Sequence, residues 1–393
     1  MDTQNRNDAN LNRRGFFKTT GAGLAAAGMA MGDQANPAAR ALTEKEKLDR
    51  IASNTWPIRD IFKTASTRAN PQIDAMKKKY GEITMLDFPD FTKNTFPGVY
   101  HMDLFSGLFG DVTDPSMFTV PAGRGNAAPA TAPPATPPAT PGAAAGAGRG
   151  AGPGGGGPRL GEFDPSSASG KKWLEKMANK MVVTGTKCQH ISNNAPTNIC
   201  VENLELRKAG IQVAKNWLDA GAILGAKSMR VNSGGPRVAP TPGQGSDGYP
   251  KNDELAKLLT NCIESFKEMA DYGGKVGVKV TLENHWGLTA NPTNIQIIID
   301  EVHNPFCEAS PDFFNWEHDY LCYHGLAAVA PYAHTNVHAK YWNRWATCDI
   351  ARCVRIMEST RFAGTYALEF EDGPFDNRIE GAKYIFKEVM AAL

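Results

Sequence analysis

The chain has 393 residues, with 42 Lys and Arg against 41 Asp and Glu, so its formal net charge at pH 7 is +1. Hydrophobic residues make up 41% and charged residues 21% of the sequence, a balance that is typical of globular proteins and excludes a wholly disordered chain. The neutral charge argues against a nucleic-acid partner, because such binding depends largely on clustered Lys and Arg that neutralise phosphates.

The N-terminal segment has the pattern of an export signal. Residues 12–18 read NRRGFFK, and a weakly apolar run rich in Ala and Gly follows from Thr19 to Met31. Ala39-Arg40-Ala41 suits signal peptidase, so residues 1–41 are predicted to be a twin-arginine signal and the mature protein to be periplasmic or otherwise exported. The apolar run is shorter than the roughly 20 residues of a membrane span, so we do not interpret it as a membrane anchor. We also expect no membrane span in the protein after signal removal.

Residues 121–158 form a low-complexity segment that consists almost entirely of Ala, Pro, Gly and Thr. Such a composition cannot bury enough apolar surface to offset the entropy of ordering. The preceding stretch, Thr43 to Phe118, is short for a separate domain, and the strand and helix pattern continues beyond the segment. We therefore expect a disordered insert within a single domain, residues 42–393, rather than a linker between two domains.

From Thr43 onward, short β-branched or aromatic runs alternate with longer helical patterns, which indicates βα units and a parallel sheet. The strands are predicted at Asn54–Phe62, Val99–Phe105, Val183–Ile191, Ala226–Asn232, Val278–His285, Phe306–Phe313, Thr335–Tyr341 and Thr365–Phe370. The helices are predicted at Ile83–Phe96, Ser169–Lys180, Val201–Leu224, Glu254–Tyr272, Asn294–Val302, Asp319–Ala330, Cys348–Ser359 and Arg378–Leu393. Eight such units predict an α/β fold, a (β/α)8 TIM barrel, with the insert after the second strand. A doubly wound sheet is the alternative, but no GxGxxG follows the first strand.

The seven cysteines are odd in number and contain no CxxC pair, so the sequence holds no zinc knuckle or redox motif. We interpret them as small buried hydrophobic residues. Export would allow a disulfide, but the sequence does not indicate which cysteines would pair.

Four successive predicted strands end in residues of the kind that bind metal, namely Glu283, Asp312, His338 and Glu369. Their spacing is close to one βα repeat, roughly 31 residues in a barrel of about 250, and active sites of such barrels lie at the carboxyl ends of the strands. Three carboxylates and one imidazole at one point would repel unless a divalent cation lay between them. This ligand set favours Mn²⁺, Mg²⁺ or Co²⁺ over zinc.

Several of these strand ends resemble motifs of a known superfamily. Residues 282–285 (LENH), 337–340 (VHAK) and 368–373 (LEFEDG) are similar to the fifth, seventh and eighth strand motifs of the sugar phosphate isomerase/epimerase superfamily, the xylose isomerase-like TIM barrels. Residues 230–235 (RVNSGG) resemble its fourth. The resemblance runs from about Asn54 to Leu393 apart from the insert. It implies one divalent ion held by Glu283, Asp312, His338 and Glu369.

The resemblance also implies a type of chemistry. In the superfamily's epimerases and isomerases the two strand-end glutamates move protons on opposite faces of a ketose, a role that falls to Glu283 and Glu369. The expected enzyme removes a proton next to a sugar carbonyl through a metal-stabilised enediolate. Export favours a free ketose or a keto-glycoside over a sugar phosphate.

Three other functions stay open or are disfavoured. A lyase or dehydratase acting on a 3-keto-sugar or 3-keto-glycoside would use the same site, and a non-catalytic exported carbohydrate-binding barrel would keep the fold without turnover. Apurinic endonucleases share this barrel, but they need a His-rich multinuclear zinc site and a basic surface, which the neutral charge and the single ligating His disfavour. A homo-oligomer is compatible with the sequence.

Other polar residues at strand ends are expected to bind the substrate or to support the ligands: His190, Arg230, His285 and Lys340. Asp103 ends the second predicted strand, where many relatives have a glutamate, and its role stays undecided. Aromatic side chains follow the fifth, sixth and seventh strands, where they could stack on sugar rings or simply pack: Trp286, Trp316 and Trp342.

Overall fold

The computed structural model describes residues 41–63, 71–119, 161–236, 248–345 and 348–393. The chain divides into two units, residues 1–43 and 44–393, and every element described below belongs to the second. The predicted signal, up to residue 40, and the predicted insert lie outside the described residues. Within the described parts, no helix is long and apolar enough to cross a membrane.

Eight parallel strands form one sheet in the order β6-β5-β4-β3-β2-β1-β8-β7. The strands are β1 Ile51–Asn54, β2 His101–Phe105, β3 Lys187–Ser192, β4 Ser228–Arg230, β5 Lys279–Leu282, β6 Cys307–Ala309, β7 Asn336–Trp342 and β8 Thr365–Asp372. The segment after β6 pairs with β7: His338 N donates to Pro311 O (3.0 Å) and Phe313 N donates to His338 O (3.1 Å). This pairing joins the two ends of the sheet, and the predicted (β/α)8 barrel is confirmed.

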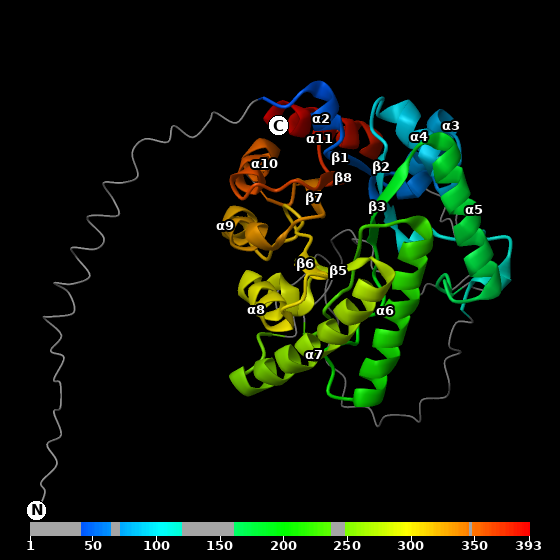
Figure 1. The fold of residues 1–393 in the computed structure, drawn as a ribbon. Coiled ribbons are helices and arrows are strands. Elements are labelled where there is room, and N and C mark those ends of the chain that lie inside the picture. Colours follow the sequence, from blue (N-terminus) through cyan, green and yellow to red (C-terminus); the bar gives the residue numbers. More distant parts are fainter. Residues whose placement is uncertain (1–40, 64–70, 120–160, 237–247, 346–347) are drawn as a thin grey trace, which may run out of the picture. The chain divides into compact units, whose positions relative to one another are not determined.

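Helices surround the strands, as Figure 1 shows for α5 to α11. The helices are α2 Glu44–Leu48, α3 Pro71–Tyr80, α4 Phe88–Thr95, α5 Ala168–Thr184, α6 Leu204–Leu224, α7 Asn252–Val276, α8 Pro292–Val302, α9 Asp319–Val329, α10 Ile350–Ser359 and α11 Arg378–Ala392. Polar side chains begin several of them: the Asn203 side chain, for example, accepts from Leu206 N at the start of α6. Because helices cover the outside, the strands are buried on both faces, and β1 and β4 have no exposed residue.

Several element boundaries differ from the sequence prediction, and the helices α2 and α3 were not predicted. Two of the differences at strands have a clear local cause. The predicted strand 54–62 is wrong over most of its length, because β1 ends at Asn54 and a 3-10 helix, Trp56–Ile61, follows. Pro57 lies at the start of this helix, where a residue without an amide hydrogen is tolerated, and it could not have donated to a sheet ladder. The third strand begins at Lys187 rather than Val183, because α5 continues to Thr184 and ends at Gly185 with φ +69°.

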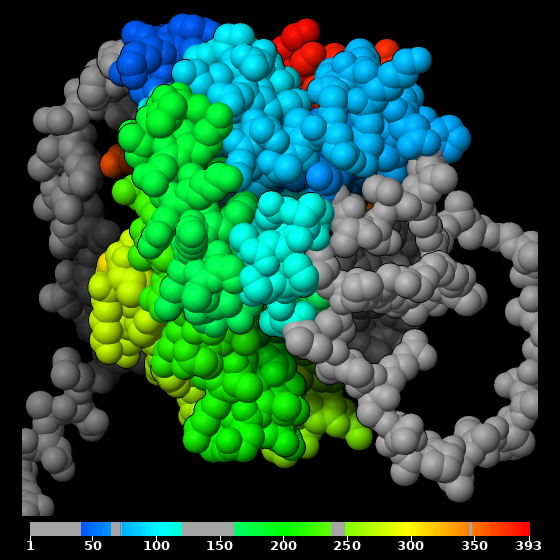
Figure 2. Space-filling view, turned by 90° about the vertical axis from the view of Figure 1, so that its right-hand side faces the viewer, coloured from blue at the N-terminus to red at the C-terminus, as the bar shows by residue number. Residues whose placement is uncertain are grey.

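The two chain segments that flank residues 120–160 are held together. Thr119 N donates to Glu162 O and Asp164 N donates to Met117 O, both at 2.8 Å, and Phe118 pairs with Phe163 in an antiparallel bridge. Figure 2 shows the face on which the segment before the gap, in cyan, lies beside the green region that contains α5 and α6. Residues 117–119 and 162–164 therefore lie side by side in the fold.

All seven cysteines lie in the described residues and none forms a disulfide; Cys348 is partly buried and the other six are buried. The expectation of small buried hydrophobic residues is thereby confirmed for those six. Burial raises the pKa of the Cys188 and Cys307 thiols far above the ordinary value, which keeps them protonated and unreactive.

A substitution at Gly273 tests how closely α7 packs against the residue that precedes β5. A Cβ at this position would lie 2.4 Å from the backbone oxygen of Val278, whereas at the neighbouring Gly274 the nearest atom would be a Phe306 ring carbon at 3.3 Å. We expect Gly273→Ala to lower the free energy of unfolding by about 1–3 kcal/mol, since the clash outweighs the gain of up to about 1 kcal/mol in helix propensity. Urea unfolding followed by circular dichroism measures the change. Equal stability of Gly273→Ala and the control Gly274→Ala would contradict this packing.

Candidate active site

The four side chains predicted to bind metal meet at the carboxyl ends of adjacent strands. Glu283 directly follows β5, Asp312 follows β6, and His338 and Glu369 lie within β7 and β8. All four are buried, with exposed fractions between 0 and 8%. Successive side chains of a strand point to opposite faces, so His338 and Lys340, two residues apart in β7, both point into the barrel. Lys340 is also the register partner of Glu369 in β8.

The distances within this cluster suit a single small cation. One ligand atom each of Glu283, Asp312 and His338 lies within 4.8 Å of the others. Nδ1 of His338 is 3.1 Å from Oε2 of Glu283 and 3.5 Å from Oε2 of Glu369. An ion about 2.1–2.2 Å from each ligand atom would hold such atoms roughly 3–4 Å apart, so only a small contraction is needed.

Two buried polar atoms of the cluster, His338 Nδ1 and Asp312 Oδ2, make no hydrogen bond of good geometry with the described residues. Each has an ionic neighbour instead: Glu283 Oε2 lies 3.1 Å from His338 Nδ1, and Lys340 Nζ lies 3.1 Å from Asp312 Oδ2. The other oxygen of Asp312, Oδ1, accepts from Phe314 N (2.8 Å) and Asn315 N (2.9 Å), which directs Oδ2 toward the cluster. Buried polar atoms without a hydrogen bond are uncommon in proteins, and a cation bound between these residues would have both atoms as ligands. The residues present therefore fit the divalent ion that the sequence predicted.

Two buried basic side chains separate the carboxylates. Nζ of Lys340 lies 3.1 Å from Asp312 Oδ2 and 2.9 Å from Glu369 Oε1. Arg230 pairs with Oε2 of Glu283, and its Nε donates to the backbone oxygen of Asn193 at 3.1 Å. Four carboxylates, including that of Asp103, thus face two permanently charged cations. Burial lowers the pKa of His338, but the surrounding carboxylates outweigh it and hold this pKa well above its usual value, so His338 adds a further positive charge in the metal-free protein.

The pKa shifts follow from burial and from these pairs. Burial, with Glu369 and Glu283 nearby, raises the pKa of Asp312 to about 7 even though Lys340 opposes the shift. Burial lowers the pKa of the Lys340 ammonium, but the neighbouring carboxylates outweigh it and hold this pKa well above its usual value. For Glu283, burial raises the pKa, but Arg230 and His338 together outweigh it and hold this pKa well below its usual value, so this carboxyl stays ionised.

The two other histidines predicted at the site are neutral at pH 7. Burial lowers the pKa of His190 to about 4 and that of His285 to about 3. Nδ1 of His190 lies 2.8 Å from the Ser228 hydroxyl, while its Nε2 is buried without a hydrogen-bond partner among the described residues. The His190 ring lies 5.7 Å from that of His338, and the His285 ring lies 6.3 Å from that of Trp286. Both imidazoles are close to the cluster, and each can act as an uncharged hydrogen-bonding group.

Two asparagines that the sequence analysis missed complete the cluster. Asn315 donates to Glu283 Oε1 and accepts from Lys340 Nζ, both at 2.9 Å. Asn284 exchanges two hydrogen bonds with the backbone of Asp312. The sequence indicates these asparagines only by their position, because each lies within three residues of a predicted metal ligand.

A third missed residue, Arg344, lies among the tryptophans that follow the strands. Its guanidinium carbon is 5.4 Å from the Trp286 ring, 5.1 Å from Trp342 and 4.4 Å from Trp345. Its Nη1 is buried and has no hydrogen-bond partner among the described residues. The Trp342 ring also lies 5.5 Å from Nζ of Lys340, which connects this group to the cluster. Trp316 is completely buried, its ring lies against Gly325, and its Nε1 has no hydrogen-bond partner among the described residues.

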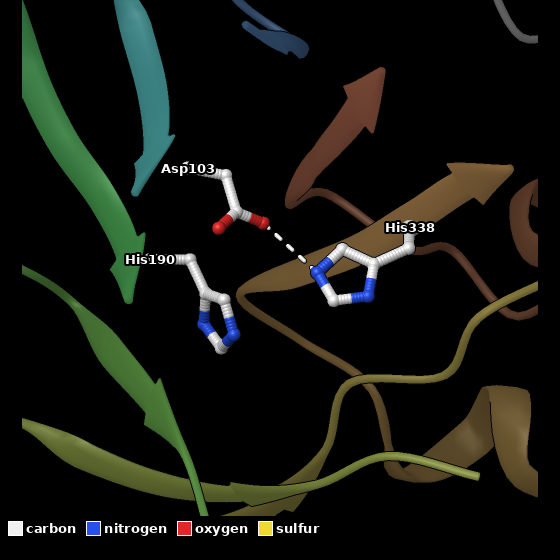
Figure 3. Close-up of side chains that lie close together, drawn as sticks. All are labelled: Asp103, His190 and His338. Atoms are coloured by element: carbon white, nitrogen blue, oxygen red, sulfur yellow. Dashed lines mark hydrogen bonds and ion pairs between the residues drawn. The ribbon is translucent and has the colours of Figure 1, made fainter. Parts of the chain in front are cut away.

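Asp103, whose role the sequence left undecided, points into the same barrel. Figure 3 shows Asp103 from β2, His190 from β3 and His338 from β7 with their side chains directed toward one another. One ligand atom of each lies within 4.8 Å of the others, so these residues form a second group that shares His338 with the first.

The comparison with protein families agrees with this architecture. Residues 156–388 match the model of the xylose isomerase-like TIM barrel family. The chain belongs to this family. A search of the curated proteins gives no match.

Solved structures of xylose isomerase-like and related barrels resemble this chain at low identity. A protein from Sinorhizobium meliloti 1021 is 11% identical, covers 87% of this chain and 97% of its own, and has a TM-score of 0.50, which supports the fold. A D-allulose 3-epimerase from Methylomonas sp. is 13% identical over 58% of this chain and 84% of its own, with a TM-score of 0.46. The 3-keto-D-glucoside 4-epimerase of E. coli is 16% identical over 54% and 83%, with a TM-score of 0.43.

Replacing Lys340 by methionine tests the balance of charge in the cluster. Without the ammonium, Asp312 and Glu369 lose their common partner, so we expect Lys340→Met to lower the stability of the metal-free protein by about 3 kcal/mol. A divalent cation then has more repulsion to relieve, and Mn²⁺ should raise the melting temperature of the variant more than that of the wild type. Differential scanning fluorimetry with chelator and with Mn²⁺ measures both effects.

The matched control for this experiment is Lys279→Met. Lys279 pairs with the buried Glu308 at 2.5 Å on β5 and β6, outside the cluster. This variant should respond to Mn²⁺ as the wild type does. The same Mn²⁺ response in both variants would show that Lys340 does not balance charge at the site.

Proposed function

We propose that this protein is a metal-dependent sugar isomerase or epimerase that removes a proton next to a sugar carbonyl. The carrying observation is the buried group of Glu283, Asp312 and His338, whose ligand atoms lie within 4.8 Å of one another, with Glu369 3.5 Å from Nδ1 of His338. Membership of the xylose isomerase-like family supports the assignment. The same four residues would hold one Mn²⁺, Mg²⁺ or Co²⁺ ion.

A divalent ion bound there would polarise the carbonyl and the adjacent hydroxyl of the sugar and would stabilise the enediolate left after proton removal. Glu283 and Glu369 are the candidate acid–base groups. One carboxylate takes the proton from the carbon beside the carbonyl, and the electron pair of that C–H bond becomes the carbon–carbon double bond of the enediolate. Return of a proton to the opposite face gives the epimer, whereas return to the neighbouring carbon gives the isomer.

The other residues of the site orient the charged groups and the sugar. Lys340 and Arg230 hold the carboxylates in place through the ion pairs described above. Neutral His190 and His285 suit hydrogen bonds to hydroxyl groups. The faces of Trp286 and Trp342 suit the C–H surface of a sugar ring, and the unpaired Nη1 of Arg344 beside them suits a sugar oxygen.

The proposed substrate is a free ketose or a keto-glycoside rather than a sugar phosphate. This part of the proposal follows from the export signal predicted at residues 1–41, since sugar phosphates are mostly cytoplasmic. We propose that the mature protein acts in the periplasm or outside the cell.

The unequal engagement of the two glutamates favours elimination as a second candidate reaction. Both oxygens of Glu283 are already engaged, Oε1 by Asn315 and Oε2 by Arg230, whereas Glu369 is held mainly through one oxygen by Lys340. A site with a single free base suits a lyase on a 3-keto-sugar or 3-keto-glycoside, in which the proton is lost and a group on the next carbon departs with its electron pair.

The test uses the mature protein, its metal content and its turnover. We expect about one divalent ion per chain, and turnover of free ketoses or 3-keto-glucosides that a chelator abolishes and Mn²⁺, Mg²⁺ or Co²⁺ restores. Product analysis by NMR in D₂O distinguishes the reactions, because the epimer and the isomer carry deuterium at different carbons, whereas the elimination product contains a new carbon–carbon double bond. A wild-type protein that binds no ion and turns over none of these sugars would instead be a non-catalytic carbohydrate-binding barrel.

Glu369→Gln tests the assigned base. The amide cannot accept a proton, so we expect kcat to fall by at least about 100-fold at saturating metal. The surface variant Glu380→Gln is the control, since Glu380 contacts Tyr80 and Lys383 outside the barrel. Wild-type turnover in Glu369→Gln would remove Glu369 from the mechanism, and metal content measured on the same sample separates lost chemistry from lost metal.

A further inference from the structure

The contact between Asp103 and His338 crosses the interior of the barrel. Asp103 lies on β2 and His338 on β7, and the sheet order places β1 and β8 between these strands. Oδ2 of Asp103 is nevertheless 2.9 Å from Nε2 of His338, and neither residue is exposed. Figure 3 shows this contact as the dashed line between the two side chains.

Asp103 is held in one orientation by its own donors. The Ser192 hydroxyl on β3 donates to Oδ1 at 2.7 Å, and the Asn336 amide on β7 donates to Oδ2 at 3.2 Å. Asp103 is therefore a fixed acceptor aimed at one nitrogen of His338.

An imidazole that binds a metal uses one nitrogen and donates a hydrogen bond from the other. In His338, Nε2 faces Asp103 while Nδ1 faces Glu283 and Glu369. We propose that Asp103 is a positioning residue that accepts the Nε2–H of His338 and thereby keeps the Nδ1 lone pair directed at the ion-binding cluster. This inference rests on the proposed function, because it assigns a support for one ligand of that metal site.

The group formed by Asp103, His190 and His338 allows a competing interpretation, in which it holds a second ion. The contacts disfavour it. A nitrogen that carries a proton has no lone pair to give, and the 2.9 Å separation of His338 Nε2 and Asp103 Oδ2 is a hydrogen-bond distance. Nδ1 of His190 is engaged with Ser228, so this residue would offer only Nε2. The number of ions bound per chain distinguishes the two interpretations.

The experiment titrates MnCl₂ into the metal-free mature protein by isothermal titration calorimetry. We expect one Mn²⁺ per wild-type chain, and a 10- to 100-fold weaker affinity in Asp103→Ala, the range known for removal of such supporting carboxylates. Asp103→Asn should fall between the two, because its amide oxygen still accepts the hydrogen bond but has no charge. Glu308→Gln removes another buried strand carboxylate, one paired with Lys279 away from the site, and should bind as the wild type does.

The outcomes separate this inference from the function on which it rests. A wild type that binds no Mn²⁺ overturns the metal site and the role of Asp103 together. Wild-type binding of one ion with unchanged affinity in Asp103→Ala overturns the positioning role alone. Two ions in the wild type and one in Asp103→Ala would replace it by a second ion site.

A spectroscopic measurement covers the case in which Asp103→Ala does not fold. The visible absorption of bound Co²⁺ depends on ligand geometry, so Asp103→Asn loaded with Co²⁺ should show a changed spectrum if His338 is reoriented. Glu308→Gln should keep the wild-type spectrum. An Asp103→Asn spectrum and affinity identical to wild type would overturn the positioning role.

Discussion

Repulsion among buried carboxylates is the constraint on which this structure depends. Asp103, Glu283, Asp312 and Glu369 all project into one barrel and are almost wholly removed from water. Like charges in a medium of low dielectric constant repel strongly, so every neighbouring group has to offset that repulsion. Lys340 bridges two of the carboxylates, Arg230 pairs with a third, and His338 faces the remaining one.

The barrel holds these charged side chains in place because its strands are paired with one another. Lys340 and Glu369 are register partners of adjacent strands, and the segment bearing Asp312 is joined to β7 by the hydrogen bonds that close the sheet. A shift of one residue in any of these pairings would turn the side chain away from the cluster. The hydrogen bonds that close the barrel therefore also position the side chains of the site.

The sequence predicted those features that depend on periodicity. The regular recurrence of Glu283, Asp312, His338 and Glu369 placed them on one rim, because one βα unit separates each from the next. Contacts between distant segments carried no such signal: the hydrogen bond of Asp103 across the barrel depends on side-chain length and rotamer, which spacing does not encode. The first strand was misplaced for a local reason, since an apolar run containing Pro57 suits a 3-10 helix as well as a strand end.

Lys340 also has a consequence for the order in which the protein is assembled. Its ammonium lies 3.1 Å from Asp312 Oδ2 and 2.9 Å from Glu369 Oε1, and Lys340 and Glu369 are register partners of adjacent strands. The positive charge that brings these two carboxylates together is therefore supplied by the chain itself. It reaches its place when β7 pairs with β8, so strand pairing and neutralisation of the two carboxylates accompany each other as the barrel folds.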